Sequence, residues 1–264
     1  MTLSAELPLN SLCNTTQRTA LSNSYRSTTT TSSSTAKLAS RLRLSAAAAA
    51  AASAVVAAAP SPPRRMLGAE AERRARARGV GPGASPGELG STYSWDVGHF
   101  RAWVDNYNPN MASSTATYNM RYLYNNASWC GPECPIFMYC GNEGFIELFA
   151  ANSGFLWESA VPFGALVVFP EHRFYGESLP FGNASFELEN LGLLTAEQAI
   201  ADYAWFVTSL KANLSAPNAP VVLFGGSYGG MLAAWMRIKF PTISAGAIAS
   251  SAPVLEVPGI MDPT

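Results

Sequence analysis

The sequence has few basic side chains in the part where a folded domain is expected. Only 13% of its 264 residues are charged, and only six of its 17 Lys and Arg lie after residue 85, beside 15 of its 18 Asp and Glu. Those six basic residues are scattered along an acidic stretch. Nucleic-acid binding needs clustered Lys and Arg that displace counterions from phosphates. The composition therefore argues against a nucleic-acid partner.

Long, strongly apolar runs are also missing. The Ala-rich segment Ala46 to Ala59 is weakly apolar and shorter than the roughly 20 residues that span a bilayer. It follows Arg41 and Arg43 and precedes Pro60, so it resembles the apolar part of a secretory signal peptide. A Ser-rich, acid-poor leader is also typical of an organelle transit peptide, and a misassigned start is a third alternative, but we favour the secretory signal. We expect no stable membrane span.

The first 85 residues read as a leader rather than a folded unit. Ser and Thr dominate up to Thr35, and such segments bury too little apolar surface to offset chain entropy. A Pro-, Gly- and Arg-rich linker follows from Pro60 to Pro86. We predict a disordered leader over residues 1–85 and one folded domain over residues 86–264.

Cysteine is scarce, with four residues in the chain. Cys130 and Cys134 flank a Gly-Pro-Glu turn in which a short disulfide fits, whereas zinc would need two further ligands that do not cluster nearby. We predict that disulfide and no metal site. The domain also contains glycosylation sequons, which favour the secretory pathway. They begin at Asn126, Asn183 and Asn213, and a further one in the leader begins at Asn14.

Short apolar runs alternate with helical patterns after residue 91, which indicates a parallel or mixed sheet with crossover helices. One predicted helix begins near Thr195, with Gln198 at capping-box spacing, and Gly230–Phe240 forms a second that is apolar nearly all round and therefore predicted to be buried. Ligands of open α/β sheets bind beyond the carboxyl ends of the strands. The predicted strands, each ending in polar or glycine residues, are Pro135–Tyr139, Gly164–Phe169, Pro220–Phe224 and Ala245–Ser250.

The pattern Gly225-x-Ser227-x-Gly229 lies between the third predicted strand and the second helix. That context is typical of a nucleophile elbow, in which a strained turn exposes a serine hydroxyl and glycines avoid collisions. The N–H of Tyr228 would then donate to a developing oxyanion. A structural Gly-rich turn is the alternative. A phosphate cradle is disfavoured because the Lys-Ser/Thr ending of a P-loop is absent.

Two further loops follow predicted strands. Gly141 and Asn142 lie in a Gly-rich loop upstream of the elbow, where an α/β-hydrolase places its second oxyanion donor, although an ordinary turn has the same composition. Glu143 can hold a substrate amine or serve as a structural acceptor for backbone N–H groups. His172 follows the next strand but precedes the serine, whereas the triad order in this fold is Ser, Asp or Glu, then His. We interpret His172 as structural.

Five motifs follow one another along the chain: Gly141–Gly144, Glu171–Gly182, Leu194–Ala199, Gly225–Trp235 and Ser251–Val254. In this order, Ile136–Val254 resembles the serine peptidase family that includes lysosomal Pro-X carboxypeptidase and dipeptidyl peptidase II. Upstream, Tyr118–Tyr122 is similar to the family's Phe-Asn-x-Arg-Tyr, and Asp96–Phe100 approximates its Val-Asp-His-Phe.

The resemblance implies a lysosomal, vacuolar or secreted exopeptidase that acts on peptides with proline near a terminus. It also implies an α/β-hydrolase core, a helical cap, a Ser-Asp-His triad and no cofactor, and it leaves open a homodimer. The family's cap, Asp and His follow the elbow, yet after Ser227 this chain contains no histidine and only Asp262 as an aspartate.

We therefore expect the N-terminal portion of an α/β-hydrolase core, truncated before the cap and the last strands. We also expect this portion to be inactive, because a serine without a base is a poor nucleophile. A catalytically inactive, binding-only protein of this fold is the alternative. The choice between carboxypeptidase and dipeptidyl peptidase stays open, since Met231–Trp235 leans to the first and Pro253–Leu255 to the second.

Overall fold

The computed structural model describes residues 79, 81–108 and 117–255. The predicted leader over residues 1–85, with its Ala-rich segment and the sequon at Asn14, lies almost wholly outside these residues, as does Asp262. All described residues belong to a single compact unit of the chain. Within that unit the backbone N–H of Gly83 donates to Glu147 at 2.7 Å, so the end of the predicted linker is bound to the domain.

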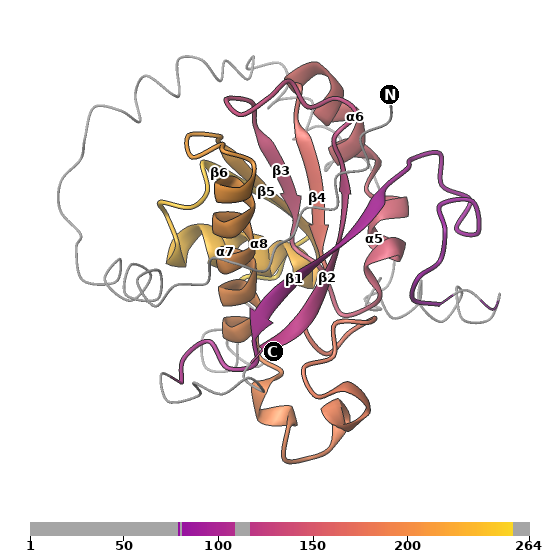
Figure 1. Ribbon diagram of the computed structural model, residues 1–264, viewed down its shortest axis with the longest axis vertical. Helices are drawn as coiled ribbons and strands as arrows, with labels where there is room; N and C mark the ends of the chain where they lie inside the picture. Colours follow the sequence, from indigo (N-terminus) through magenta and orange to yellow (C-terminus); the bar gives the residue numbers. More distant parts are fainter. Residues whose placement is uncertain (1–78, 80, 109–116, 256–264) are drawn as a thin grey trace. The chain divides into compact units, whose positions relative to one another are not determined.

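One mixed β-sheet forms the centre of this unit, with the strand order β1-β2-β4-β3-β5-β6 (Figure 1). The pairs β1-β2 and β2-β4 are antiparallel, whereas β4-β3, β3-β5 and β5-β6 are parallel. The four strands expected from the sequence are confirmed, and two antiparallel strands precede them. The bounds are β1 Asp96–Trp103, β2 Thr117–Asn125, β3 Ile136–Tyr139, β4 Leu166–Pro170, β5 Val221–Gly226 and β6 Gly246–Ser250.

The two central parallel strands owe their position to continuous apolar runs. Every residue of β3 and β4 is buried, because helices cover both faces of the sheet at this point. The outer strand β1 instead alternates between buried and exposed residues, as expected for a strand with one wet face. The hydrophobic core therefore lies around β3 and β4.

Helices pack on both faces of the sheet (Figure 1). On one face, α5 and α6 bury Ile146 and Trp157 against aromatic residues of the strands, among them Phe169 and Phe224. On the other face, α7 contacts both β1 and α8. The bounds are α5 Ile146–Asn152, α6 Gly154–Phe163, α7 Ala196–Asn213 and α8 Tyr228–Lys239, with 3₁₀ turns η1 Gly182–Phe186 and η2 Leu191–Leu193 between β4 and α7.

The two helices expected from the sequence are present, with corrections. Thr195 caps α7 by accepting the N–H of Gln198 at 3.2 Å, but the Gln198 side chain does not return to Thr195 and bonds Asp105 and Asn106 instead, so only half of the capping box forms. The expectation of a wholly buried α8 is wrong. Its Leu232 side is buried, whereas Ile238 is 74% exposed, because the helix packs on the sheet with one face only.

The sheet carries a sharp turn where β5 passes directly into α8. A largely parallel sheet, helices on both faces and a strand-turn-helix elbow that holds a serine are the features of an α/β-hydrolase core. The described residues thus form part of such a core.

Candidate active site

Ser227 occupies the turn between β5 and α8 with φ 54° and ψ −125°, a backbone conformation that is strained for a residue with a side chain. A Cβ at Gly225 would collide with the backbone of Gly229, and a Cβ at Gly229 would collide with the side-chain oxygen of Asn142. The two glycines of the motif are therefore required by close backbone approach.

Hydrogen bonds hold the strained turn from two sides. The N–H of Ser227 donates to the carbonyl of Ser250 on β6 at 2.9 Å, and Asn142 Nδ2 donates to the carbonyl of Gly226 at 2.8 Å. Within the described part of the chain, the hydroxyl of Ser227 makes no hydrogen bond. The turn thus presents a half-buried, unpartnered hydroxyl beyond the carboxyl end of β5.

The loop after β3 brings Gly141 and Asn142 beside this turn. The Gly141 carbonyl accepts the hydroxyl of Tyr203 at 3.0 Å, and Asn142 Oδ1 accepts the hydroxyl of Tyr139 at 2.9 Å. Because the Asn142 amide already bridges Tyr139 and the elbow, its side chain acts as a clamp. Within the same loop, the N–H of Gly144 turns back to the carbonyl of Asn142 at 3.0 Å.

Glu143 follows Asn142 and is only partly buried, but its Oε2 is shielded from water and has no hydrogen-bond partner among the described residues. The alternative role as an acceptor for backbone N–H groups therefore finds no support there. A carboxylate oxygen without a partner is costly, so the loop offers one unsatisfied acceptor near the elbow.

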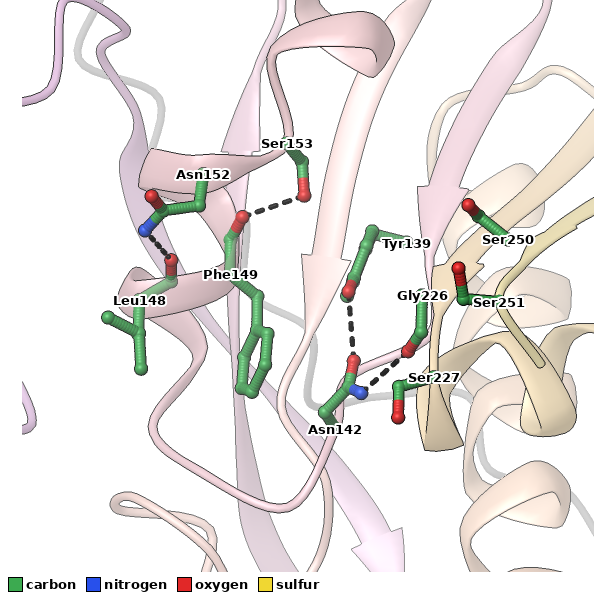
Figure 2. A pocket seen from close by; sticks show the side chains of 10 residues that line it. All are labelled: Tyr139, Asn142, Leu148, Phe149, Asn152, Ser153, Gly226, Ser227, Ser250 and Ser251. Atoms are coloured by element: carbon green, nitrogen blue, oxygen red, sulfur yellow. Dashed lines mark hydrogen bonds between the residues drawn. The ribbon is translucent and has the colours of Figure 1, made fainter. Parts of the chain in front are cut away.

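A cavity of about 400 Å³ opens beside Ser227 (Figure 2). Side chains from the β3 and β5 ends face residues of α5 across it, and none of the lining side chains is charged. The cavity therefore suits an uncharged group. Its lining residues are Tyr139, Asn142, Leu148, Phe149, Asn152, Ser153, Gly226, Ser227, Ser250 and Ser251.

The chain has two histidines, and neither bonds to Ser227. His99 lies exposed on β1. His172 is fully buried after β4, with Nδ1 2.6 Å from the carbonyl of Arg173 and Nε2 3.1 Å from the hydroxyl of Tyr228. Burial lowers the pKa of His172 to about 4. This neutral, enclosed ring agrees with the structural role inferred from its place in the sequence.

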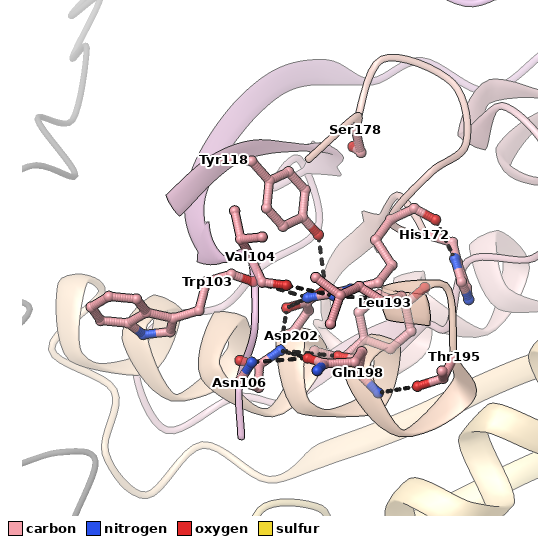
Figure 3. A network of polar contacts seen from close by, with 12 residues as sticks. Trp103, Val104, Asn106, Tyr118, His172, Ser178, Leu193, Thr195, Gln198 and Asp202 are labelled. Carbon is pink, nitrogen blue, oxygen red and sulfur yellow. Dashed lines mark hydrogen bonds and ion pairs between the residues drawn. The ribbon is translucent and has the colours of Figure 1, made fainter. Parts of the chain in front are cut away.

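Arg173, the next residue, bonds to a buried polar network, of which Figure 3 shows Tyr118 and Asp202. Its guanidinium binds both carboxylate oxygens of Asp202 on α7, at 2.7 and 2.8 Å. The Tyr118 hydroxyl donates to the same carboxylate at 2.8 Å. The remaining donors of Arg173 reach backbone carbonyls of Trp103, Val104 and Leu193. The network ties β1, β2 and α7 to the loop after β4.

A second buried arginine, Arg121 on β2, binds several carboxylates. It lies 2.7 Å from Glu147 and 2.7 Å from Glu171, both buried, and 3.0 Å from the half-exposed Glu177. Glu171 Oε1 also accepts the N–H of Ile146 at the start of α5. The cluster thereby fixes α5 and the loop after β4, which flank the site. Neither arginine network was predicted from the sequence, in which only the motif positions of these residues gave a signal.

The remaining sequence-predicted sites are the disulfide and the glycosylation sequons. Cys130 and Cys134 are joined in a disulfide, and Cys140 is a buried free thiol whose pKa is raised by burial. The sequon residues, at 126, 183 and 213, are all exposed. Within residues 79, 81–108 and 117–255, no group of three His, Cys, Asp or Glu could hold a metal ion. The same residues include no helix long and apolar enough to cross a bilayer.

Solved structures and curated proteins resemble this chain to different degrees. A Pyrobaculum calidifontis esterase superposes with a TM-score of 0.43 at 15% identity, over 75% of this chain and 56% of the esterase. Human lysosomal Pro-X carboxypeptidase is 46% identical over 163 residues, which are 61% of this chain and 32% of that protein. Human thymus-specific serine protease is 36% identical over 197 residues, 73% of this chain and 37% of that protein.

The chain thus spans about a third of the length of the curated relatives it matches. Residues 103–259 match the model of one protein family, described as serine carboxypeptidase S28. This match covers more than half of the chain and includes the elbow, the loop after β3 and both arginine networks. The chain belongs to the serine carboxypeptidase S28 family.

Proposed function

We propose that Ser227 is the nucleophile of a serine-type exopeptidase that cleaves peptides after a proline near one terminus. The observation that carries this proposal is the strained Ser227, whose hydroxyl is unpartnered among the described residues beside an uncharged cavity. The backbone N–H of Tyr228 serves as one oxyanion donor, and the loop of Gly141 and Asn142 supplies the second. The family membership and the names of the Pro-X carboxypeptidase relatives support the choice of reaction.

Both directions of exopeptidase attack share the same acyl group. A Pro-X carboxypeptidase and a dipeptidyl peptidase each attack a prolyl carbonyl. The carboxypeptidase releases one residue from the carboxy terminus, whereas the dipeptidyl peptidase acts on an acyl part that begins with a free amine. The uncharged lining of the cavity suits a pyrrolidine ring in either case. In the dipeptidyl alternative, Glu143 holds the free amine through its unpartnered Oε2.

We propose further that this chain turns over neither kind of substrate, because none of the described residues offers Ser227 a base. His99 and His172 are its only histidines, and the described contacts of His172 lead to Tyr228 and Arg173. A serine without a general base keeps its proton and attacks slowly. This observation also supports the second candidate, a catalytically inactive binding protein of the same fold.

Chemical rescue separates these functions. The chain would be incubated with an N-blocked prolyl p-nitrophenyl ester, with and without imidazole as an external base, and acylation would be located by peptide mass spectrometry. We expect acylation of Ser227 only with imidazole, and none in Ser227→Ala. Failure to acylate with imidazole would favour the binding protein. Ser227-dependent turnover without imidazole would contradict the missing base.

The direction of attack has its own test on the same assay. If Glu143 holds a free amine, an ester with an unblocked residue before proline reacts faster than the blocked ester, and Glu143→Gln abolishes that difference while leaving the blocked ester unchanged. Equal rates for both esters would instead favour the carboxypeptidase alternative.

We also propose a secretory or lysosomal location, with glycans at Asn126, Asn183 or Asn213. All three side chains are exposed, as an acceptor must be, and several relatives are named lysosomal enzymes. Glycopeptide mass spectrometry of material from the expressing cells should find at least one site occupied. Unmodified peptides at all three positions would favour organelle import by a transit peptide.

A further inference from the structure

The N–H of Tyr228 has to remain free if it is to bind an oxyanion, so no acceptor of the protein can hold it. The preceding peptide is held on both sides, by Ser250 and Asn142. The peptide between Ser227 and Tyr228 is held through its carbonyl, which accepts the N–H of Met231 at 3.0 Å. Because the peptide is planar, this bond also bears on the direction of the N–H, and the side chain of Tyr228 is a second point at which the same peptide can be held.

That side chain is anchored by His172. The carbonyl of Arg173 can only accept a hydrogen bond, so His172 Nδ1 carries the proton and donates it. Nε2 of the neutral ring is then an acceptor, and the Tyr228 hydroxyl donates to it at 3.1 Å. The rings of these two residues also pack with centroids 5.5 Å apart. One tautomer of one buried residue thus fixes the end of the Tyr228 side chain.

The side chain of His172 is itself enclosed and held by its neighbours. His172 is fully buried, and its backbone neighbour Arg173 has every guanidinium donor engaged by Asp202 and by backbone carbonyls. Tyr203 of the same helix as Asp202 packs edge-on toward His172 and binds the Gly141 carbonyl. Both sides of the proposed oxyanion site, the Tyr228 side and the Gly141 side, are therefore held by contacts that lead to residues of α7.

We propose that His172 is a positioning residue: by accepting the Tyr228 hydroxyl, it orients the Tyr228 N–H toward the oxyanion that forms when Ser227 attacks. This inference rests on the proposed role of Ser227. Because the charge of the oxyanion develops only during the reaction, loss of the anchor slows acylation and leaves ground-state binding of the ester unchanged.

The test uses the full chain in the imidazole-assisted acylation assay. We expect Tyr228→Phe and His172→Leu each to lower the maximal acylation rate about tenfold, the scale of one hydrogen bond, with the half-saturating ester concentration unchanged. The double variant should be no slower than either single variant, because both act through one bond. His172→Gln, which can place an amide oxygen near Nε2, should recover most of the rate.

Tyr107→Phe is the matched control, since Tyr107 is 57% exposed and its hydroxyl binds the Glu197 carbonyl away from the elbow. It should react like the unmodified chain. Thermal melting of each variant identifies any that is unfolded, and Tyr228→Phe, which keeps the ring, decides the matter if His172→Leu does not fold. Unchanged acylation by folded Tyr228→Phe would overturn the positioning role alone. Absence of Ser227 acylation in the unmodified chain would overturn the proposed nucleophile and, with it, this inference.

Discussion

Arg121 and Arg173 are both buried and both bind carboxylates, but the charges around them are balanced differently. Arg173 faces one buried carboxylate, Asp202, in a two-pronged contact and has every donor satisfied. Arg121 faces Glu147, Glu171 and Glu177, and its Nε has no partner among the described residues. Removal of one carboxylate charge should therefore destabilise the folded state at Arg173, where the charges are balanced. At Arg121 the same change should stabilise the folded state, because it removes surplus negative charge.

The largest effect is expected from breaking the balanced pair. Asp202→Asn leaves the guanidinium of Arg173 charged and buried without its counter-ion, which should cost about 3 to 5 kcal/mol of folding free energy. Urea unfolding measures this loss. Glu197→Gln, an exposed carboxylate on the same helix, is the control and should change stability by less than about 0.5 kcal/mol. Equal losses in the two variants would mean that Arg173 is not held by charge.

His172, bonded to the Arg173 carbonyl, makes this side of the molecule sensitive to acid. Its pKa in the folded chain is about 4, below the ordinary 6.5, so the unfolded chain binds the proton more readily. Stability should therefore fall as the pH drops from 6.5 to 4, by about 3 kcal/mol in total. His172→Gln should remove this part of the pH dependence in urea unfolding at a series of pH values. An identical pH profile for both proteins would contradict it.

The Arg121 cluster should show the opposite trend, with a smaller amplitude. Burial raises the pKa of Glu147, despite the attraction of Arg121. A raised carboxyl pKa contributes stability below the unfolded value, and this contribution is lost as the pH rises through the folded value. Glu147→Gln should therefore raise the melting temperature by a few degrees at pH 7.5 and hardly at all at pH 4.

Glu177→Gln tests whether burial is the origin of the effect expected for Glu147→Gln. Glu177 contacts the same arginine, but its side chain is 51% exposed, so water screens the charge and the effect should stay below about 0.5 kcal/mol at either pH. If Glu177→Gln stabilised the protein as much as Glu147→Gln, burial would not be the origin of the difference.

The parts of the fold that the sequence predicts are those whose signal is local. Each apolar run of β3 to β6 is a continuous segment of a few residues, and the glycines of the elbow lie within a few residues of Ser227. These segments therefore indicate strands and an elbow without knowledge of distant partners. Strands β1 and β2 were missed because they mix aromatic, polar and charged residues, and neither contains a continuous apolar run.

The side-chain networks were not predictable in this way. Arg173 and Asp202 are 29 residues apart, and Tyr118 and Asp202 are 84 apart. Gln198 sits at the spacing of a capping box, yet its side chain is drawn to Asn106, 92 residues upstream. Contacts between residues this far apart in the sequence determine where a polar side chain points, and a local sequence pattern does not predict them. The partner of His172 was missed for the same reason.

The strand order also bears on how the chain can fold while it is being synthesised. Strand β3 lies between β4 and β5, and 50 residues separate the end of β4 at Pro170 from the start of β5 at Val221. Until β5 has left the ribosome, β3 has one unpaired edge, although all four of its side chains are destined for burial. At ordinary translation rates of about 5 to 20 residues per second, that edge stays open for several seconds. A nascent chain of this topology therefore needs protection, by a chaperone or by its own loose collapse, until the segment that carries Ser227 arrives.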